Sequence, residues 1–249
     1  MGAVFYREIK AYFSSLLAWS LMAAFLAVFG FFLCLGISQY ADISQNAMQG
    51  GFPCNVNVYF VPVITSALAF LLMFFIPLMT MRSFAEDKRS GMLELLFTYP
   101  LSDWDIVLGK FFGVMPIILI LLGLSLSGIL FVGKYCTIEW GVVFSGYLGL
   151  LLFSGIVTAI GIFASSITSS QLAAASLNYA LVFFLWFLAM PEQNGAFYTS
   201  RIGNLSLVSH MEFFAKGVIC SQDVLYYLAG AVFFIYLAVC CLESRKWRN

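Results

Sequence analysis

Charged residues are scarce in this 249-residue chain: they make up 10% of it, against about 25% in an ordinary soluble domain. Apolar residues make up 62%. A soluble fold of this size cannot bury so many apolar residues, because small folds leave much of their surface exposed. The formal net charge is zero, which gives no electrostatic basis for a nucleic-acid partner. The composition therefore excludes an ordinary soluble domain and indicates a protein that lies in lipid.

Recognisable catalytic motifs are also missing from the sequence. It contains no GxxxxGKS or GxxxxGKT phosphate loop, no HExxH motif and no GxSxG elbow. The single histidine, His210, lies between two apolar runs, and we expect a structural or surface role for it. We therefore predict that the chain is not an enzyme and has no catalytic residue, no metal site and no cofactor of its own.

The six cysteines form no CxxC pair, and their spacing suits neither zinc nor iron–sulfur ligation. Free cysteine usually behaves as a small apolar residue, which is the reading we prefer for most of them. Three fall in segments predicted to lie on the outer side, namely Cys54, Cys136 and Cys220. A disulfide between two of them stays open, since sequence does not pair them.

Six long apolar stretches fill most of the chain. A transmembrane helix needs about 20 mainly apolar residues, whereas strands of a membrane barrel alternate apolar and polar residues. These runs are continuous, so we predict an all-α membrane protein with a single transmembrane domain over residues 1–249 and six transmembrane helices. The predicted spans are 16–38, 59–81, 106–132, 142–167, 172–190 and 224–242.

Lysine and arginine are unevenly distributed among the predicted loops. With the N-terminus inside, the outer segments hold only Lys134, Arg201 and Lys216, and the inner segments hold all the others. Because inner loops of membrane proteins carry the excess of positive charge, this places both termini in the cytoplasm. Lys110, near the start of the third span, is expected to extend toward the membrane surface.

Residues 1–15 have an amphipathic pattern, which predicts a helix lying on the inner membrane surface. The alternative is a frayed extension of the first span. Apolar residues at helical spacing occupy one face, and charged residues occupy the other. The apolar residues are Phe5, Ile9, Tyr12 and Phe13, and the charged residues are Arg7, Glu8 and Lys10.

The inner loop at 82–105 is the most polar part of the chain. Ser83, with Glu86 three residues later, forms a candidate capping box that predicts a short cytoplasmic helix over 83–99. Pro100 ends that helix, and Ser102 with Asp105 forms a second capping box that opens the third span. The other interpretation of the same charges is a solvated loop.

Other loops and glycines give further predictions. The inner turn near 167–171 is short, so the fourth and fifth spans are predicted to form an antiparallel pair. Gly155 and Gly161 are expected to allow close packing of helices. The outer segment 191–223 is half apolar and is predicted to hold short helices.

No aspartate or glutamate lies in the middle of any predicted span. Proton- and ion-coupled transporters commonly depend on such residues, as do intramembrane aspartyl proteases. If the protein moves a substrate, the energy is therefore expected to come from outside the chain. The polar helix at 83–99 is a suitable contact for a cytoplasmic motor.

Residues 81–111, MRSFAEDKRSGMLELLFTYPLSDWDIVLGKF, resemble the signature inner loop of type-2 ATP-binding-cassette (ABC) exporter permeases. The resemblance is greatest to the gliding-motility-type branch. Leu16-Leu17 departs from the pattern, since the family often has a proline after the two serines. Four other stretches agree in order and spacing, namely 7–19, 161–175, 213–228 and 242–247.

The resemblance implies a membrane-spanning permease subunit of the bacterial inner membrane. It pairs with a second permease chain, identical or related, and with cytoplasmic ABC ATPases that bind ATP and Mg²⁺. Membrane lipid and a periplasmic auxiliary protein are further expected partners, while the cargo stays open. The alternative function is a non-transporting scaffold that transmits force between an ATPase and a periplasmic partner.

In that family the helix after the second span is a coupling helix that docks into the ATPase. Carried over to this sequence, the resemblance implies that the glutamates meet basic or amide groups and that the basic residues meet acidic groups or lipid phosphate. The glycine would permit close approach. The implied contact residues are Arg82, Glu86, Lys88, Arg89, Gly91 and Glu94.

Overall fold

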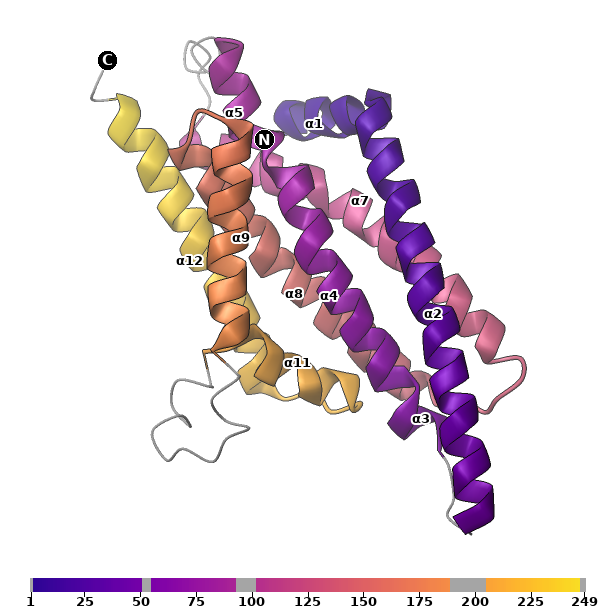
Figure 1. The fold of residues 1–249 in the computed structure, drawn as a ribbon. Helices are drawn as coiled ribbons and strands as arrows, with labels where there is room; N and C mark the ends of the chain where they lie inside the picture. Colours follow the sequence, from indigo (N-terminus) through magenta and orange to yellow (C-terminus); the bar gives the residue numbers. More distant parts are fainter. Residues whose placement is uncertain (1, 51–54, 93–101, 189–204, 247–249) are drawn as a thin grey trace.

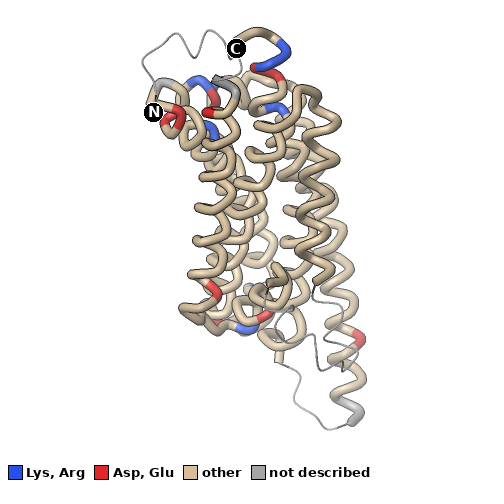
Figure 2. The backbone as a smooth tube through the Cα atoms, turned by 90° about the vertical axis from the view of Figure 1, so that its left-hand side faces the viewer, with Lys and Arg blue, Asp and Glu red and all other residues tan. Residues whose placement is uncertain are grey.

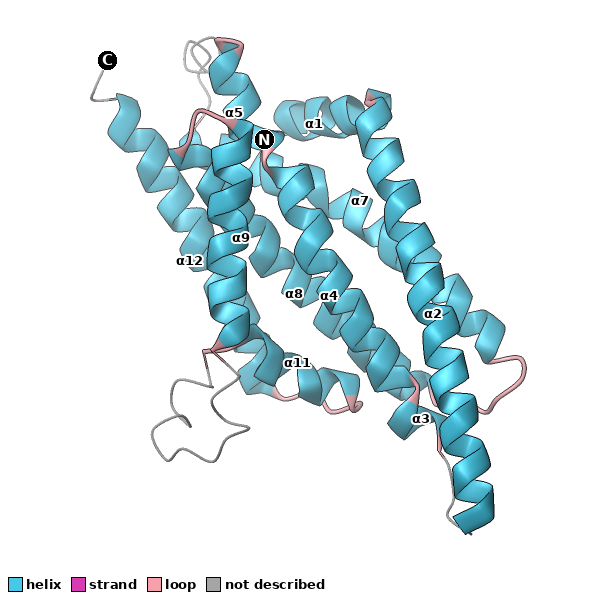
Figure 3. Ribbon diagram, viewed as in Figure 1, coloured by secondary structure: helices cyan, strands magenta, loops and turns pink. Residues whose placement is uncertain are grey.

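The computed structural model describes residues 2–50, 55–92, 102–188 and 205–246, and all regular elements in these ranges are α-helices (Figures 1 and 3). The predicted all-α fold class is confirmed. In chain order the helices are α1 (Gly2–Ser14), α2 (Leu16–Gly50), α3 (Val56–Tyr59), α4 (Val61–Thr80), α5 (Arg82–Arg89), α7 (Asp103–Val132), α8 (Trp140–Ile167), α9 (Gln171–Phe187), α11 (Leu207–Ala215) and α12 (Ser221–Lys246).

Within the described ranges, five helical stretches are long and apolar enough to cross a membrane. They are Leu16–Ala47, Val56–Arg89, Asp103–Val132, Trp140–Ile167 and Ser221–Ser244. The remaining predicted span, 172–190, corresponds to α9, which is shorter at 17 residues. Residues 189 and 190 of that span lie outside the described residues. The apolar runs thus identify the long helices.

Helix α8 lies at the centre of the bundle and contacts α4, α5, α7, α9, α11 and α12. Small residues along it let these helices approach, and aromatic side chains fill the space between them. Phe153 of α8, for example, is fully buried and packs edge-on against Trp186 of α9 and Tyr227 of α12. Helices α8 and α9 are joined by a short turn, and they form the predicted antiparallel pair (Figure 1).

The two glycines singled out in α8 behave differently. A Cβ atom on Gly161 would lie 2.1 Å from Thr80 Oγ1 of α4 and 2.6 Å from Asn178 Nδ2 of α9. A Cβ on Gly155 would have no heavy atom within 4 Å. The prediction of close packing is therefore confirmed for Gly161 and wrong for Gly155, because only Gly161 faces the junction of three helices.

Most of the lysine and arginine residues gather at one end of the bundle, together with both described ends of the chain (Figure 2). Helix α1 lies across this end instead of along the bundle, while α11 lies at the opposite end (Figure 1). The boundary between α4 and α5 falls here as well, at Met81, whose N–H donates to the carbonyl of Pro77 at 3.0 Å. This end therefore holds α1, α5 and the first turns of α7.

We predict that Gly161→Ala destabilises the protein by about 1–3 kcal/mol, because the added methyl group overpacks the junction of α4, α8 and α9. Gly155→Ala is the matched control in the same helix, and it should cost nothing because its site is open. Unfolding of both variants in detergent micelles by heat or denaturant checks this. Equal stability of the two variants would contradict the packing argument.

Candidate functional site

Helix α5 has one buried side and one exposed side. Ser83, Phe84 and Ala85 are buried, whereas Glu86 and Arg89 are exposed. The predicted helix over 83–99 is interrupted, because α5 ends at Arg89 and a turn follows, and residues 93–99 lie outside the described residues.

Gly91, the implied close-approach residue, lies in that turn with a φ of 71°, a left-handed conformation that glycine adopts without a steric penalty. Glu94, which the resemblance also implied as an ATPase contact, lies outside the described residues.

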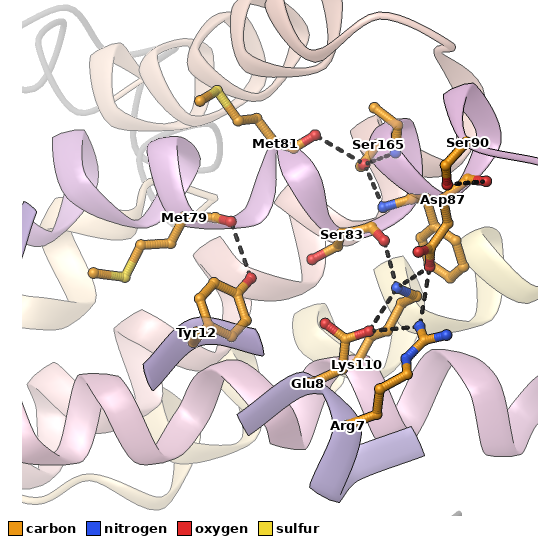
Figure 4. Close-up of polar contacts among 12 residues, drawn as sticks. Arg7, Glu8, Tyr12, Met79, Met81, Ser83, Asp87, Ser90, Lys110 and Ser165 are labelled. Carbon is orange, nitrogen blue, oxygen red and sulfur yellow. Dashed lines mark hydrogen bonds and ion pairs between the residues drawn. The ribbon is translucent and has the colours of Figure 1, made fainter. Parts of the chain in front are cut away.

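The first turn of α5 is held by α8. The backbone N–H groups of Phe84 and Ala85 donate to Ser165 Oγ of α8 at 2.9 and 3.0 Å, and that hydroxyl donates to the Met81 carbonyl at 3.3 Å (Figure 4). The predicted capping box of Ser83 and Glu86 is wrong. The N-cap is Met81, and the hydroxyl that accepts from the first turn of α5 belongs to a serine distant in sequence. The second predicted cap is confirmed, since Ser102 Oγ accepts from the N–H of Asp105 at 3.1 Å.

Lys88 binds the C-terminal end of α8. Its ammonium donates to the carbonyls of Ser165 at 3.2 Å and Thr168 at 2.8 Å, and also to the carbonyl of Ser166. The last carbonyls of a helix lack partners within the helix and form the negative end of its dipole. Lys88, expected to meet acidic groups or lipid phosphate, is thus engaged with its own chain and joins α5 to α8.

A buried lysine in α7 joins α5 to the N-terminal helix. Lys110 is 1% exposed, and its Nζ lies 2.5 Å from Asp87 Oδ2 of α5 and 2.9 Å from Glu8 Oε1 of α1 (Figure 4). It also donates to the Ser83 carbonyl and lies 4.9 Å from the Phe84 ring centre. The expectation that Lys110 reaches the membrane surface is wrong, because its charge is neutralised in place.

Arg7 completes a cluster of four charged residues, which we call the charge cluster: Arg7, Glu8, Asp87 and Lys110. Arg7 Nη2 donates to Glu8 Oε1 at 2.9 Å and to Asp87 Oδ2 at 3.2 Å. Burial alone would lower the pKa of Arg7, but hydrogen bonds and charges from Glu8 and Asp87 raise it above the ordinary value. Two cations and two anions therefore balance at the meeting point of α1, α5 and α7.

Close contact of α1 with α7 depends on Gly113, where a Cβ would lie 2.7 Å from Glu8 Cβ. On the same side of α1, the Tyr12 hydroxyl donates to the Met79 carbonyl at 3.0 Å (Figure 4). Burial raises the pKa of Tyr12, which keeps it a neutral donor. The predicted charged face of α1 is wrong at Glu8, which is buried.

Among these residues, the sequence predicts Glu8 on a charged helix face and places Asp87 in the polar inner loop at 82–105. Ser165 lies in the stretch 161–175, one of those that agree with the family pattern. The one available signal was Lys110, because a charge inside an apolar span usually has a partner. What the sequence did not contain is the identity of that partner, since Glu8 is distant from Lys110 along the chain.

At the opposite end, His210 of α11 is buried and its Nδ1 lies 2.6 Å from Asp223 Oδ1 of α12. Its ring also stacks on Tyr226, with ring centres 4.1 Å apart. These contacts fasten α11 to α12 and fit the expected structural role.

Cys136 and Cys220 are free thiols, so they are not bonded to each other, while Cys54 lies outside the described residues. The described residues contain no group of three metal-ligating side chains.

We predict that Lys110→Met destabilises the protein by about 3–5 kcal/mol, because Glu8 and Asp87 would lose their shared buried cation. Lys10→Met is the control, since Lys10 is exposed on α1, and a surface change of this kind shifts stability by about 0.5 kcal/mol or less. Combining Lys110→Met with Asp87→Asn should recover part of the loss, because charge balance returns. Thermal unfolding in detergent measures all three variants, and equal effects at Lys10 and Lys110 would refute the assignment.

Comparison with known proteins gives one family. A profile of the ABC-2 family transporter proteins matches residues 35–194, which is more than half of the chain. A comparison with curated proteins finds no match. The match covers the C-terminal part of α2 and all of α3, α4, α5, α7, α8 and α9, and so includes three of the helices that surround the charge cluster and its Ser165 contact. This multi-pass membrane chain therefore belongs to the ABC-2 family of transporter proteins.

Proposed function

We propose that this chain is the permease subunit of an ABC exporter, driven by separate cytoplasmic ATPase subunits that bind ATP and Mg²⁺. The observation that carries the proposal is the anchoring of α5. Its exposed residues Glu86 and Arg89 are available to a partner, while its other side is fixed to three helices. A push on α5 therefore moves α1 and α7 through the charge cluster and α8 through Ser165 and Lys88.

Fixed attachment is what a coupling element requires. A flexible loop would absorb the motion of the ATPase, whereas a helix held by buried ion pairs and backbone hydrogen bonds transmits it. The long helices can then rock as rigid bodies between two packings, one open to each side of the membrane. On this proposal Glu86 and Arg89 make the contact, Lys88 holds α5 to α8, and Arg82 and Gly91 lie at its two ends.

We place the end that carries both termini and most of the lysine and arginine residues in the cytoplasm of a bacterium, following the positive-inside tendency. Helix α9 serves as the sixth span, since 17 residues is at the lower end of the range that crosses a bilayer. An even number of spans agrees with the position of both ends of the chain at one end of the bundle (Figure 2).

A second permease chain would complete the transporter, and the sequence of residues 81–111 supports the gliding-motility-type branch of the family. The same anchoring of α5 would also serve a scaffold that passes force to a periplasmic partner. Substrate movement by the purified complex in sealed vesicles distinguishes the two, because only the exporter moves cargo.

We predict that Glu86→Arg combined with Arg89→Glu reduces ATPase co-purification and permease-stimulated ATP turnover by about tenfold. Reversed charges at the contact oppose those of the partner, and 1.4 kcal/mol of lost binding corresponds to a factor of about ten. Lys216→Glu is the control, because Lys216 is exposed beside α11 at the opposite end. Unchanged ATP turnover in the double variant, or purification with no ATPase, would rule out the coupling role.

A further inference from the structure

A cavity of about 400 Å³ lies beside the charge cluster, between α1, the start of α2, the end of α4, and α5. Its volume falls within the range of roughly 300–1,000 Å³ that holds small molecules. Leucines of two helices, among them Leu17, Leu21 and Leu78, line it together with charged residues of α1 and α5. Such a lining suits an amphipathic molecule, with a charged group and an apolar part.

Not every charged residue that lines the cavity belongs to the charge cluster. Three cations and three anions line it, and the four residues of the charge cluster neutralise each other. The other two are Arg82 and Glu86. Arg82 Nε is buried and has no hydrogen-bond partner among the described residues. A buried guanidinium N–H requires an acceptor, and a phosphate oxygen is a strong one.

Arg82 and Glu86 are four residues apart on α5, so their side chains lie on the same face of the helix. A ligand bound between them would meet one positive and one negative group. A headgroup with both a phosphate and an ammonium matches this pair, whereas a purely anionic headgroup would leave Glu86 unfavourably close to negative charge.

The cavity also lies at the level of the membrane where lipid headgroups are expected, at the ends of the predicted spans. Its apolar lining comes from the first turns of α2 and the last turns of α4, which are the ends of two predicted spans. Its charged lining belongs to the end where the lysine and arginine residues gather (Figure 2). Pockets between transmembrane helices at this level are where phospholipid headgroups bind.

We propose that this cavity binds a phospholipid whose headgroup carries a phosphate and a primary ammonium, as phosphatidylethanolamine does. Arg82 holds the phosphate through its buried Nε–H, and Glu86 holds the ammonium. The acyl chains follow the apolar surface at Leu17 and Leu21. The bound lipid fills the space between α1 and α5 beside the charge cluster. Glu86 is also the residue proposed to contact the ATPase, so it holds the ammonium in the chain without a docked ATPase, and the lipid proposal requires only a membrane location.

The test uses the full chain alone, stripped of lipid in detergent. Native mass spectrometry measures its binding of phosphatidylethanolamine and phosphatidylglycerol. The wild type should prefer phosphatidylethanolamine by about tenfold, the factor expected for one charge-assisted hydrogen bond. Arg82→Gln should weaken binding of both lipids by about tenfold. Glu86→Gln should remove the preference, because phosphatidylethanolamine loses its ammonium partner and phosphatidylglycerol no longer meets a repelling carboxylate.

Arg89→Gln is the matched control, because Arg89 is exposed on the same helix and does not line the cavity. Equal binding of the two lipids by the wild type would overturn the proposal, as would an Arg89→Gln effect equal to that of Arg82→Gln. Displacement of the lipid by inorganic phosphate or by glycerophosphoethanolamine at equal concentration would assign the cavity to a soluble phosphate instead. Since Glu86 is exposed, Glu86→Gln keeps the test decisive even if Arg82→Gln unfolds.

Discussion

The buried ammonium of Lys110 sets the arrangement of the whole charged end. A lysine that is 1% exposed must be neutralised, because an unpaired charge in an apolar interior costs far more than folding can supply. Here two carboxylates from different helices, Glu8 and Asp87, lie within hydrogen-bonding distance of it. To bring them there, α1 must lie across α7 at Gly113, and α5 must begin directly after Met81 at the end of α4.

The same requirement explains why α5 is firmly held despite being short and polar. Eight residues do not form a stable helix alone, and α5 makes backbone hydrogen bonds to Ser165 besides its ion pairs. Through Lys88 it also stabilises the end of α8, the central helix of the bundle. The contacts that stabilise the end of the molecule are therefore the ones through which force on α5 would reach the transmembrane helices.

Local signals predicted most helices and some of their ends. The apolar runs located the long helices, and Ser102 marked the start of α7. Predictions failed where a residue distant in sequence supplied the partner: Ser83 was expected to cap a helix that Ser165 holds, and Lys110 was expected at the surface although Glu8 and Asp87 reach it. Helical periodicity also placed Glu8 in solvent, because an amphipathic pattern records polarity and does not record which polar residue finds a buried partner.

The sequence by itself determined that this is an all-helical membrane protein whose positive charge gathers at one end, since hydrocarbon admits only helices or closed barrels, and continuous apolar runs are typical of helices. The sequence also indicated the family, because the residues that carry the resemblance are consecutive along the chain. Only the tertiary structure decided that Arg7, Glu8, Asp87 and Lys110 form one cluster and that a cavity with Arg82 and Glu86 lies beside it. The reason is physical: ion pairing depends on distance in space, and α1, α5 and α7 are brought together by the packing of the bundle around α8.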